Sequence, residues 1–340
     1  MGERRLLDII IPHGGEPWRV CRPFFDMLRC QRGADFSAVR VIVVHDGCGP
    51  WAEELLEGLP VAVSQRSVWM SRGVSGDRMP AGVSAARNWG LKCSDAEWVS
   101  FCDADDLYAS AWALHCILDA LRRPEAADYD LLWNPFYVET AGGRDICGMN
   151  WVFVHGKFYR REWLQREGIQ FDRRLYYAED SAFNATVDAA IDHKRIGEIQ
   201  SDATLYLWTL RPDSVTGRPE NQARNVLGLF DRHEIVAEEY RRRGLEGDAD
   251  ALLAKAAWDG FYQCHRTDLD IRDRQRLRAR IGRLCAAHDP EIRRVQGEAL
   301  ETVRQASRRE AEKKHMDGVP ESLFEAWYTA AVTEYGGGTA

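Results

Sequence analysis

Short hydrophobic runs alternate with amphipathic stretches over about the first 210 residues of the chain. Runs at residues 6–11, 39–45, 61–65, 97–102 and 204–208 have the length and composition of buried strands. Between them lie stretches with helical spacing, long enough to cross over a sheet: Trp18–Arg29, Trp51–Glu57, Ser84–Lys92 and Ser110–Arg122. The alternation predicts βαβ units and an α/β fold, a mostly parallel, Rossmann-like sheet flanked by helices.

The pattern changes after Pro219. Helical spacing with few β-branched residues continues through 222–243, 249–264, 268–287 and 290–315. We therefore expect two domains, an α/β domain over 1–219 and a C-terminal helical region over 220–340. The segment 64–81, rich in Gly, Ser and Arg, is typical of a loop or lid.

Composition narrows the class of protein. With 340 residues, 45% hydrophobic and 29% charged, the chain is globular and has no apolar run long enough to span a membrane. The apolar run near the N-terminus meets Pro12 and Gly14 without a cleavage site, which favours a strand over a signal peptide. Nine cysteines without a C-x-x-C pair indicate neither a zinc ribbon nor a disulfide framework, and a cytoplasmic location is expected.

The net charge of -8 argues against a general polyanion binder, but it is unevenly distributed. Residues 272–314 hold thirteen Lys or Arg against seven Asp or Glu, about +6, which leaves the remainder near -14. This basic stretch has two interpretations, a surface for an anionic partner or a solvated helical surface of interspersed charges.

The most informative segment is WVSFCDADDLY, residues 98–108, where an apolar strand runs into Asp103, Asp105 and Asp106. Open α/β sheets bind ligands at the carboxyl ends of their strands, and carboxylates two residues apart can share a divalent cation. Such a cation would neutralise a diphosphate. Acidic residues after strands are also common in plain turns and helix caps.

Two further segments suit a nucleotide. GVSAARNWGL, residues 82–91, opens a helix and carries Arg87 one turn in, where a phosphate or a polar nucleotide edge would be favoured. VRVIVVHDGCGP, residues 39–50, is a buried strand that ends in His45 and Asp46, and Asp46 could accept a hydrogen bond from a base or ribose. A surface arginine and a simple turn would account for the same residues without a ligand.

Two later segments complete the set. LYYAEDSAFNATV, residues 175–187, has Glu179 and Asp180 at the start of a helix, where acids also simply complement the helix dipole. LYLWTLRPDSVTG, residues 205–217, ends a strand with Arg211 and Ser214, which can hold phosphate or belong to a polar loop.

These five segments, in this order, resemble the family-two inverting glycosyltransferases with the GT-A fold. The chain supplies IIIP, HDG, GVSAARN, DADD, EDSAF and YLWTLRPDS, with HGKFYRREWL (155–164) similar to the segment that usually precedes E-D. The resemblance covers about residues 6–216. It implies a nucleotide-sugar donor, a Mn²⁺ or Mg²⁺ ion and a C-terminal region that helps to choose the acceptor.

The resemblance also implies roles for individual residues. Pro12, His13 and Asp46 would line the nucleoside pocket, and Arg87 would approach the base or ribose. Asp103 would contact the nucleotide sugar and Asp105 would ligate the metal. Asp180 would be the general base with Glu179 beside it. Arg211 would help hold the diphosphate, and Ser214 belongs to the same nucleotide-sugar-binding set.

Three positions depart from the family pattern, all near the nucleotide. His45 stands where the family usually has Asp, His13 where it usually has an aromatic residue, and Pro80 where it often has Asn. UDP is the donor nucleotide that the family resemblance favours.

The implied reaction is an in-line displacement at an anomeric carbon, with inversion. A glycan, a lipid-linked glycan or a small molecule is the expected acceptor. A second class of acceptor is a hydroxylated base of DNA, met by the Arg-rich helices and by Trp258, Tyr262, Trp327 and Tyr328. Two other classes of protein, a nucleotidyltransferase and a non-catalytic nucleotide-sugar binder, could also use such a sheet with paired acids. The C-terminal region, residues 220–340, could serve oligomerisation instead of acceptor choice.

Overall fold

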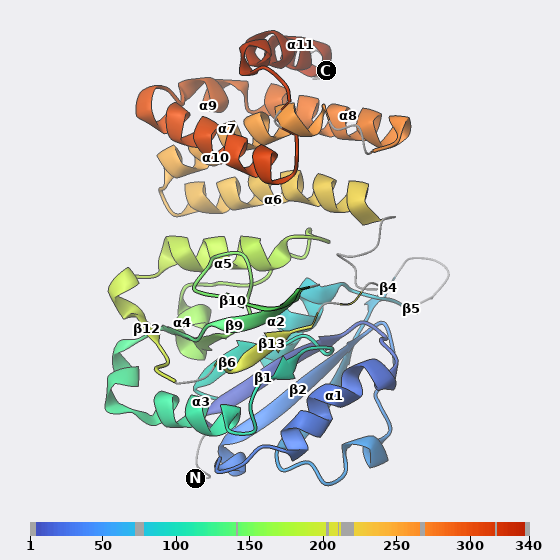
Figure 1. Cartoon of the computed structure of the whole chain (residues 1–340), viewed down its shortest axis with the longest axis vertical. Helices are drawn as coiled ribbons and strands as arrows, with labels where there is room; N and C mark the ends of the chain where they lie inside the picture. Colours follow the sequence, from blue (N-terminus) through green and yellow to red (C-terminus); the bar gives the residue numbers. More distant parts are fainter. Residues whose placement is uncertain are drawn as a thin grey trace. The chain divides into compact units, whose positions relative to one another are not determined.

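The computed structural model describes residues 5–71, 78–140, 142–201, 204–209, 211, 221–265, 269–316 and 318–336. The chain divides into two compact units, Met1–Pro212 and Asp213–Ala340. Strands and helices alternate in the first unit, and the second is built from helices (Figure 1).

A seven-stranded sheet runs through the first unit in the spatial order β12-β8-β11-β6-β1-β2-β3. In chain order its strands are β1 (Leu7–His13), β2 (Val39–Asp46), β3 (Ala62–Val68), β6 (Trp98–Phe101), β8 (Leu131–Trp133), β11 (Lys157–Arg160) and β12 (Ile196–Glu198). β1 pairs in parallel with β2 and β6, β2 with β3, and β12 with β8. Only β11, within this sheet as described, runs antiparallel to its neighbours. The predicted fold class, a mostly parallel sheet with a C-terminal helical region, is confirmed.

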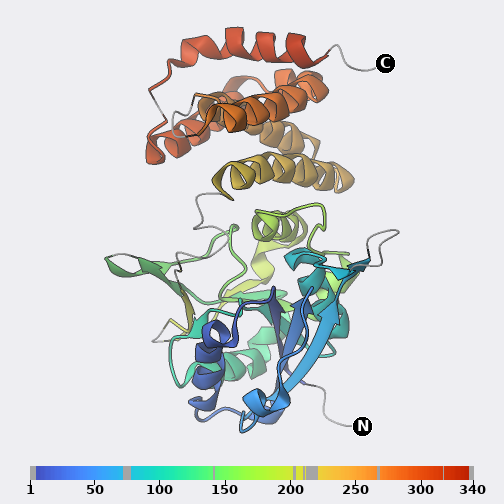
Figure 2. The ribbon, with the colours of Figure 1, turned by 90° about the vertical axis from the view of Figure 1, so that its right-hand side faces the viewer.

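The central strands β1 and β2 are buried on both faces because they are apolar at successive positions, whereas the edge strand β3 is more exposed. In β1, Leu7, Ile9 and Ile11 point into one core and Ile10 into the other. The helices α1 (Trp18–Arg29) and α3 (Ala113–Arg122) pack on the first face, and α2 (Val83–Cys93), α4 (Arg161–Arg166) and α5 (Glu179–Ala190) on the second. Figure 2 shows helices on both sides of the strands.

A second, four-stranded sheet has the order β10-β9-β13-β7. Its strands are β7 (Leu107–Tyr108), β9 (Phe136–Thr140), β10 (Gly143–Cys147) and β13 (Tyr206–Trp208). β4 (Met70–Ser71) and β5 (Arg78–Met79) form a separate pair. Because Tyr206 of β13 lies opposite Tyr108 of β7, this sheet holds residues 206–209 and 211 next to the acidic turn that follows β6.

The second unit contains α6 (Gln222–Arg242), α7 (Glu246–Gln263), α8 (Ile271–Ala287), α9 (Asp289–Arg294), α10 (Gly297–Lys313) and α11 (Phe324–Gly336). They bury a core of their own that includes Phe230, Leu253, Phe261 and Ile281. Among the residues that the structure describes, no helix combines the length and the apolarity needed to cross a bilayer.

Three local predictions were wrong. The predicted helix Trp51–Glu57 is a single 3₁₀ turn, Glu53–Leu56. None of the residues in this turn is fully buried, and Trp51 and Leu56 pack against the core only in part, which is too little to hold a longer helix. The predicted loop 64–81 begins as strand, since β3 continues to Val68 beside β2, while residues 72–77 lie outside the described residues. The single helix predicted over 290–315 is two helices, α9 and α10, and the second begins at Gly297, which has a φ of 61°.

Candidate active site

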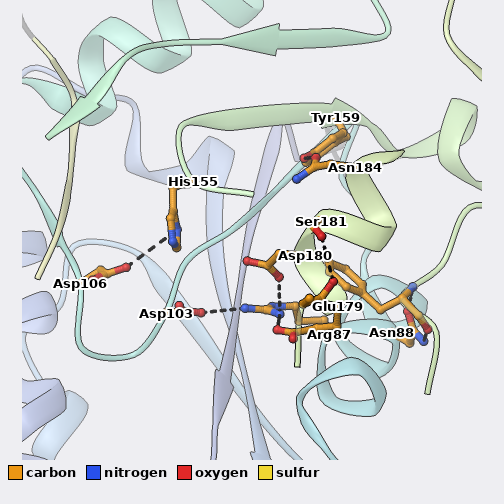
Figure 3. A network of polar contacts seen from close by, with 12 residues as sticks. Arg87, Asn88, Asp103, Asp106, His155, Tyr159, Glu179, Asp180, Ser181 and Asn184 are labelled. Atoms are coloured by element: carbon orange, nitrogen blue, oxygen red, sulfur yellow. Dashed lines mark hydrogen bonds and ion pairs between the residues drawn. The ribbon is translucent and has the colours of Figure 1, made fainter. Parts of the chain in front are cut away.

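Arg87 joins three carboxylates that come from distant parts of the chain. Its Nη1 donates to Glu179 Oε1 at 2.8 Å and to Asp180 Oδ1 at 2.6 Å, and its Nη2 donates to Asp103 Oδ1 at 2.9 Å. Figure 3 shows these side chains converging from α2, from the turn after β6 and from the start of α5. The structure thus brings together four of the residues that the sequence singles out.

Local backbone geometry aims these groups at one another. Ala178, the residue before α5, has a φ of 62°, and this left-handed turn starts the helix so that Glu179 and Asp180 occupy its first turn. Arg87 lies on the buried face of α2, with its guanidinium 5.2 Å from the ring centre of Phe171. The arginine is therefore fixed by packing as well as by its ion pairs.

The four groups change each other's ionisation. Burial disfavours the charge on Arg87, but the carboxylates of Asp180, Asp103 and Glu179 outweigh it and raise the arginine pKa further. Burial raises the pKa of Asp180 to about 8, since Arg87 offsets only part of the effect and Glu179 and Asp103 add to it. Asp180 is consequently a carboxyl group poised to exchange a proton near neutral pH.

The acidic turn after β6 is held by residues that follow β13. Asp105 Oδ2 accepts from Arg211 Nε at 2.6 Å. Buried Asp106 accepts from the Tyr206 hydroxyl at 2.5 Å and from the Thr209 amide at 2.8 Å. Burial first, and then the neighbouring acids, raise the pKa of both Asp105 and Asp106. In the contacts described, the three carboxylates of this turn have two cationic partners. Arg87 binds Asp103 and Arg211 binds Asp105.

A divalent cation fits the donors in this turn. Within the described residues, one ligand atom from each of Asp103, Asp106 and His155 lies within 4.8 Å of the others. His155 is buried, its Nδ1 has no hydrogen-bond partner among the described residues, and burial lowers its pKa to about 4. The ring is therefore neutral and offers one lone pair beside two carboxylates, whose oxygens are the donors that suit Mn²⁺ or Mg²⁺.

The residues predicted to meet the nucleoside lie at the ends of β1 and β2. Asp46 accepts from the amides of Ala81 at 2.5 Å and Gly82 at 2.9 Å, so its carboxylate ties the end of β2 to the start of α2. Pro12 lies opposite Val44 in the sheet. The His13 side chain turns toward His45, with the two Nδ1 atoms 2.9 Å apart.

Glycine is required next to Asp46. Gly47 has a φ of 70°, and a Cβ there would lie 2.8 Å from the Cα of Pro80.

The predicted residue Ser214 lies outside the described residues.

Sequence reasoning missed two members of the site. Asp106 is the last acid of DADD, and His155 opens the HGKFYRREWL segment, so both stood inside recognised motifs. Nothing in the local pattern distinguished Asp106 from a turn residue. Its burial depends on Tyr206, which is 100 positions away along the chain.

Comparisons with known proteins agree with this architecture. Residues 8–163 match the family model described as glycosyl transferase family 2. The chain is 25% identical over 269 residues to a protein named uncharacterized glycosyltransferase EpsJ of Bacillus subtilis, covering 71% of this chain and 72% of the relative.

Solved structures share the fold. The S. aureus TarS 1–349 complex with UDP superposes with a TM-score of 0.60 at 17% identity, covering 98% of this chain and 92% of the TarS chain. The TarS 1–349 complex with UDP-GlcNAc gives a TM-score of 0.50 at 19% identity, covering 90% and 92%.

Proposed function

We propose that this chain, a member of glycosyl transferase family 2, moves a sugar from a nucleoside-diphosphate sugar to an acceptor hydroxyl with inversion at the anomeric carbon. One observation carries the proposal: a single guanidinium, that of Arg87, binds both Asp103 and Asp180. Asp103 follows the parallel strand β6, and Asp180 is a carboxyl group with a raised pKa. A donor site and a proton acceptor are thereby held in a fixed relation.

Asp180 acts as the general base in this proposal. It takes the proton from the acceptor hydroxyl while the hydroxyl oxygen attacks the anomeric carbon and the bond to the diphosphate breaks. Glu179 and Asp103 share the charge of Arg87, so the guanidinium does not fully neutralise Asp180. The configuration at the anomeric carbon is inverted because, in a single displacement, the acceptor oxygen attacks from the side opposite the departing diphosphate.

Asp105 would hold a Mn²⁺ or Mg²⁺ ion beside the diphosphate after releasing Arg211, joined by Asp103, Asp106 and His155, whose ligand atoms already lie together. When bound, such an ion supplies positive charge against the charge that grows on the leaving group. Arg211, already paired with Asp105, would hold the diphosphate from the side of β13. Ser214 belongs to the same proposed set.

UDP is the proposed donor nucleotide. TarS, whose fold the chain shares, is described in complex with UDP and with UDP-GlcNAc. In the proposal Pro12, His13 and Asp46 face the nucleoside. Arg87, which the resemblance placed near the base or ribose, is buried and bound to carboxylates, so its proposed role is to position Asp103 and Asp180.

The acceptor is proposed to be a glycan, a lipid-linked glycan or a small molecule, chosen with the help of Asp213–Ala340. The basic stretch of this unit is largely paired within the unit itself: Arg280 contacts Asp231 and Glu234, and Arg304 and Arg308 both contact Glu321. This internal pairing supports the interpretation of a solvated helical surface rather than a surface for an anionic polymer.

Three of the four aromatic residues that suggested DNA, Trp258, Tyr262 and Tyr328, are buried in the core of the second unit, and the fourth, Trp327, is partly buried against it. Trp258 stacks on Phe324 with ring centres 3.7 Å apart, and Tyr262 and Tyr328 are each 2% exposed. Base stacking needs an accessible ring face. The observations therefore favour the first class of acceptor over a hydroxylated DNA base.

Donor-binding calorimetry tests the proposal. We would titrate UDP, GDP and dTDP into the whole chain in the presence of Mn²⁺, using wild type and the variants Asp105→Asn and Asp180→Asn. We expect one nucleotide to bind, with affinity lost in Asp105→Asn and kept in Asp180→Asn. Asp119→Asn, on the exposed face of α3, is the matched control and should bind as wild type does. Equal binding by all variants would contradict the site.

A further inference from the structure

Three potential metal ligands meet at the ends of β1 and β2, outside the acidic turn. His13 Nδ1 lies 2.9 Å from His45 Nδ1 and 3.3 Å from Cys48 Sγ, and the three ligand atoms all lie within 4.8 Å of one another. Both histidines are buried and Cys48 is partly exposed. The proposed transfer reaction has no use for the His45 ring or the thiol.

The hydrogen bonds around His45 fix which of its nitrogens carries the proton. The Gln65 side-chain oxygen accepts from the Trp51 amide at 2.9 Å, and the Gln65 side-chain nitrogen donates to the Trp51 carbonyl at 3.0 Å. The orientation of this amide is thereby determined. His45 Nε2, 2.8 Å from the same Gln65 oxygen, must be a donor. In the neutral ring, Nδ1 of His45 then carries no proton and presents a lone pair.

The same reasoning applies to His13. Its Nε2 lies 2.8 Å from the carbonyl oxygen of Glu16, which can only accept. Nδ1 of neutral His13 is therefore a lone pair as well. Two lone pairs face each other across 2.9 Å, and the single thiol proton of Cys48 can satisfy one of them at most. Such a contact is stable only with a positive centre between the rings.

We propose that His13, His45 and Cys48 form a binding site for Zn²⁺, with Cys48 bound as the thiolate. Two imidazole nitrogens and one thiolate are a donor set that Zn²⁺ prefers. Tetrahedral Zn²⁺, with bonds of about 2.0–2.1 Å to nitrogen and about 2.3 Å to sulfur, needs ligand atoms roughly 3.3–3.6 Å apart. The present separations of 2.9 and 3.3 Å reach that spacing with shifts of a few tenths of an ångström.

The surroundings of the three ligands match those of zinc sites. Each histidine donates its other ring N–H to an oxygen, the carbonyl of Glu16 or the amide of Gln65, which is how ligand histidines are oriented. Burial first, and then the carboxylates of Glu16 and Asp46, raise the pKa of the Cys48 thiol, so Zn²⁺ would displace the thiol proton to solvent as it binds. The Trp51 ring packs on both imidazoles, with ring centres 4.5 and 5.1 Å away.

This site differs in chemistry from the acidic turn. A thiolate and two imidazoles select Zn²⁺, whereas carboxylate oxygens suit Mn²⁺ and Mg²⁺. The two sites can therefore be examined separately by keeping Mg²⁺ in large excess. The two proposals share His13, which the transferase proposal places at the nucleoside, but Cys48 has no part in the transfer, so measurements that follow Cys48 test the zinc site separately.

Cobalt serves as the probe for sulfur ligation. We would titrate the reduced whole chain with Co²⁺ in excess Mg²⁺ and record the near-ultraviolet thiolate-to-cobalt charge-transfer band, then displace the cobalt with Zn²⁺. We expect saturation at one equivalent and loss of the band in Cys48→Ser, with Zn²⁺ affinity lowered at least about 100-fold. Cys30→Ser removes an exposed thiol elsewhere and should leave the band intact.

A second measurement needs no variant. Alkylation of each cysteine, followed by mass spectrometry with and without Zn²⁺, should show protection of Cys48 and no protection of Cys30. Absence of the charge-transfer band, its persistence in folded Cys48→Ser, or equal alkylation of Cys48 with and without Zn²⁺ would each overturn the site. A proton shared between the two rings would then remain as the positive centre.

Discussion

Replacing Asp180 with asparagine should stabilise the protein while it abolishes transfer. Asparagine has nearly the shape of aspartate but carries no charge, and burial raises the pKa of Asp180 from its ordinary 3.8 to about 8. Between these two values the folded chain holds the carboxyl protonated and the unfolded chain ionises it. Ionisation therefore favours unfolding of the wild type, and the substitution removes that cost.

The size of the effect follows from the pKa shift. One pKa unit corresponds to 1.36 kcal/mol, so the cost that Asp180 imposes is about 2 kcal/mol at pH 5 and about 4 kcal/mol at pH 7. An acid whose pKa is raised on folding does not destabilise the folded state at a pH below its pKa in the unfolded chain. At a pH above its pKa in the folded chain, it destabilises the folded state by a constant amount. The stability gain of Asp180→Asn should thus be absent below about pH 4, grow with pH and level off above about pH 8.

Urea denaturation of wild type and Asp180→Asn at pH 5, 6, 7 and 8 measures this gain. The same preparations should lose on the order of 10² to 10⁴ in transfer rate. Asp119→Asn, an exposed residue paired with Arg123, is the control and should change the unfolding free energy by less than about 0.5 kcal/mol. A loss of stability, or a gain that does not vary with pH, would show that the ion pair with Arg87 outweighs burial and would refute the reasoning.

Three further outcomes are expected. The wild-type transfer rate should rise up to tenfold per pH unit below pH 8 and level above it, because Asp180 must be ionised to take a proton; kcat measured from pH 6 to 9 checks this, and a flat profile would contradict it. Tyr206→Phe removes the hydroxyl that donates to Asp106. It should lower the free energy of unfolding, measured by urea denaturation, by about 1–3 kcal/mol and raise the KM for the donor. Gly90→Ala would bring a Cβ within 2.4 Å of Ile10 Cγ2 and should lower stability by about 1–3 kcal/mol, whereas unchanged melting would show that the helix can move away from β1.

Much of the first unit is predictable because its signals are local. β2 is apolar without a break from Val41 to Val44, as expected for a strand covered on both faces. α1 spans Trp18–Arg29 in the structure, just as its amphipathic spacing predicts. Arg87, Asp103 and Asp180 meet because the motif-bearing segments follow strands and open helices at one edge of the sheet. Ordered motifs thus predict proximity, even though each motif alone is ambiguous.

The remainder depends on pairing between distant segments. β7 has two residues and β13 three, too few to produce a periodic signal, and their pairing joins positions about 100 residues apart. The same long-range pairing buries Asp106 under Tyr206. The tautomers of His13 and His45 are equally invisible in the sequence, because they depend on Gln65 and on a backbone carbonyl.

Release of free nucleoside diphosphate tests the central claim most directly. The whole chain with Mn²⁺ would be incubated with a panel of UDP-, GDP- and dTDP-sugars and with glycan and small-molecule acceptors, and the products identified by mass spectrometry. We expect nucleoside diphosphate and a glycosylated acceptor from one donor, both lost in Asp180→Asn and in Asp105→Asn. Product formation that survives in Asp180→Asn would contradict the assignment of the base, and failure of every nucleotide sugar to bind or react would contradict the account as a whole.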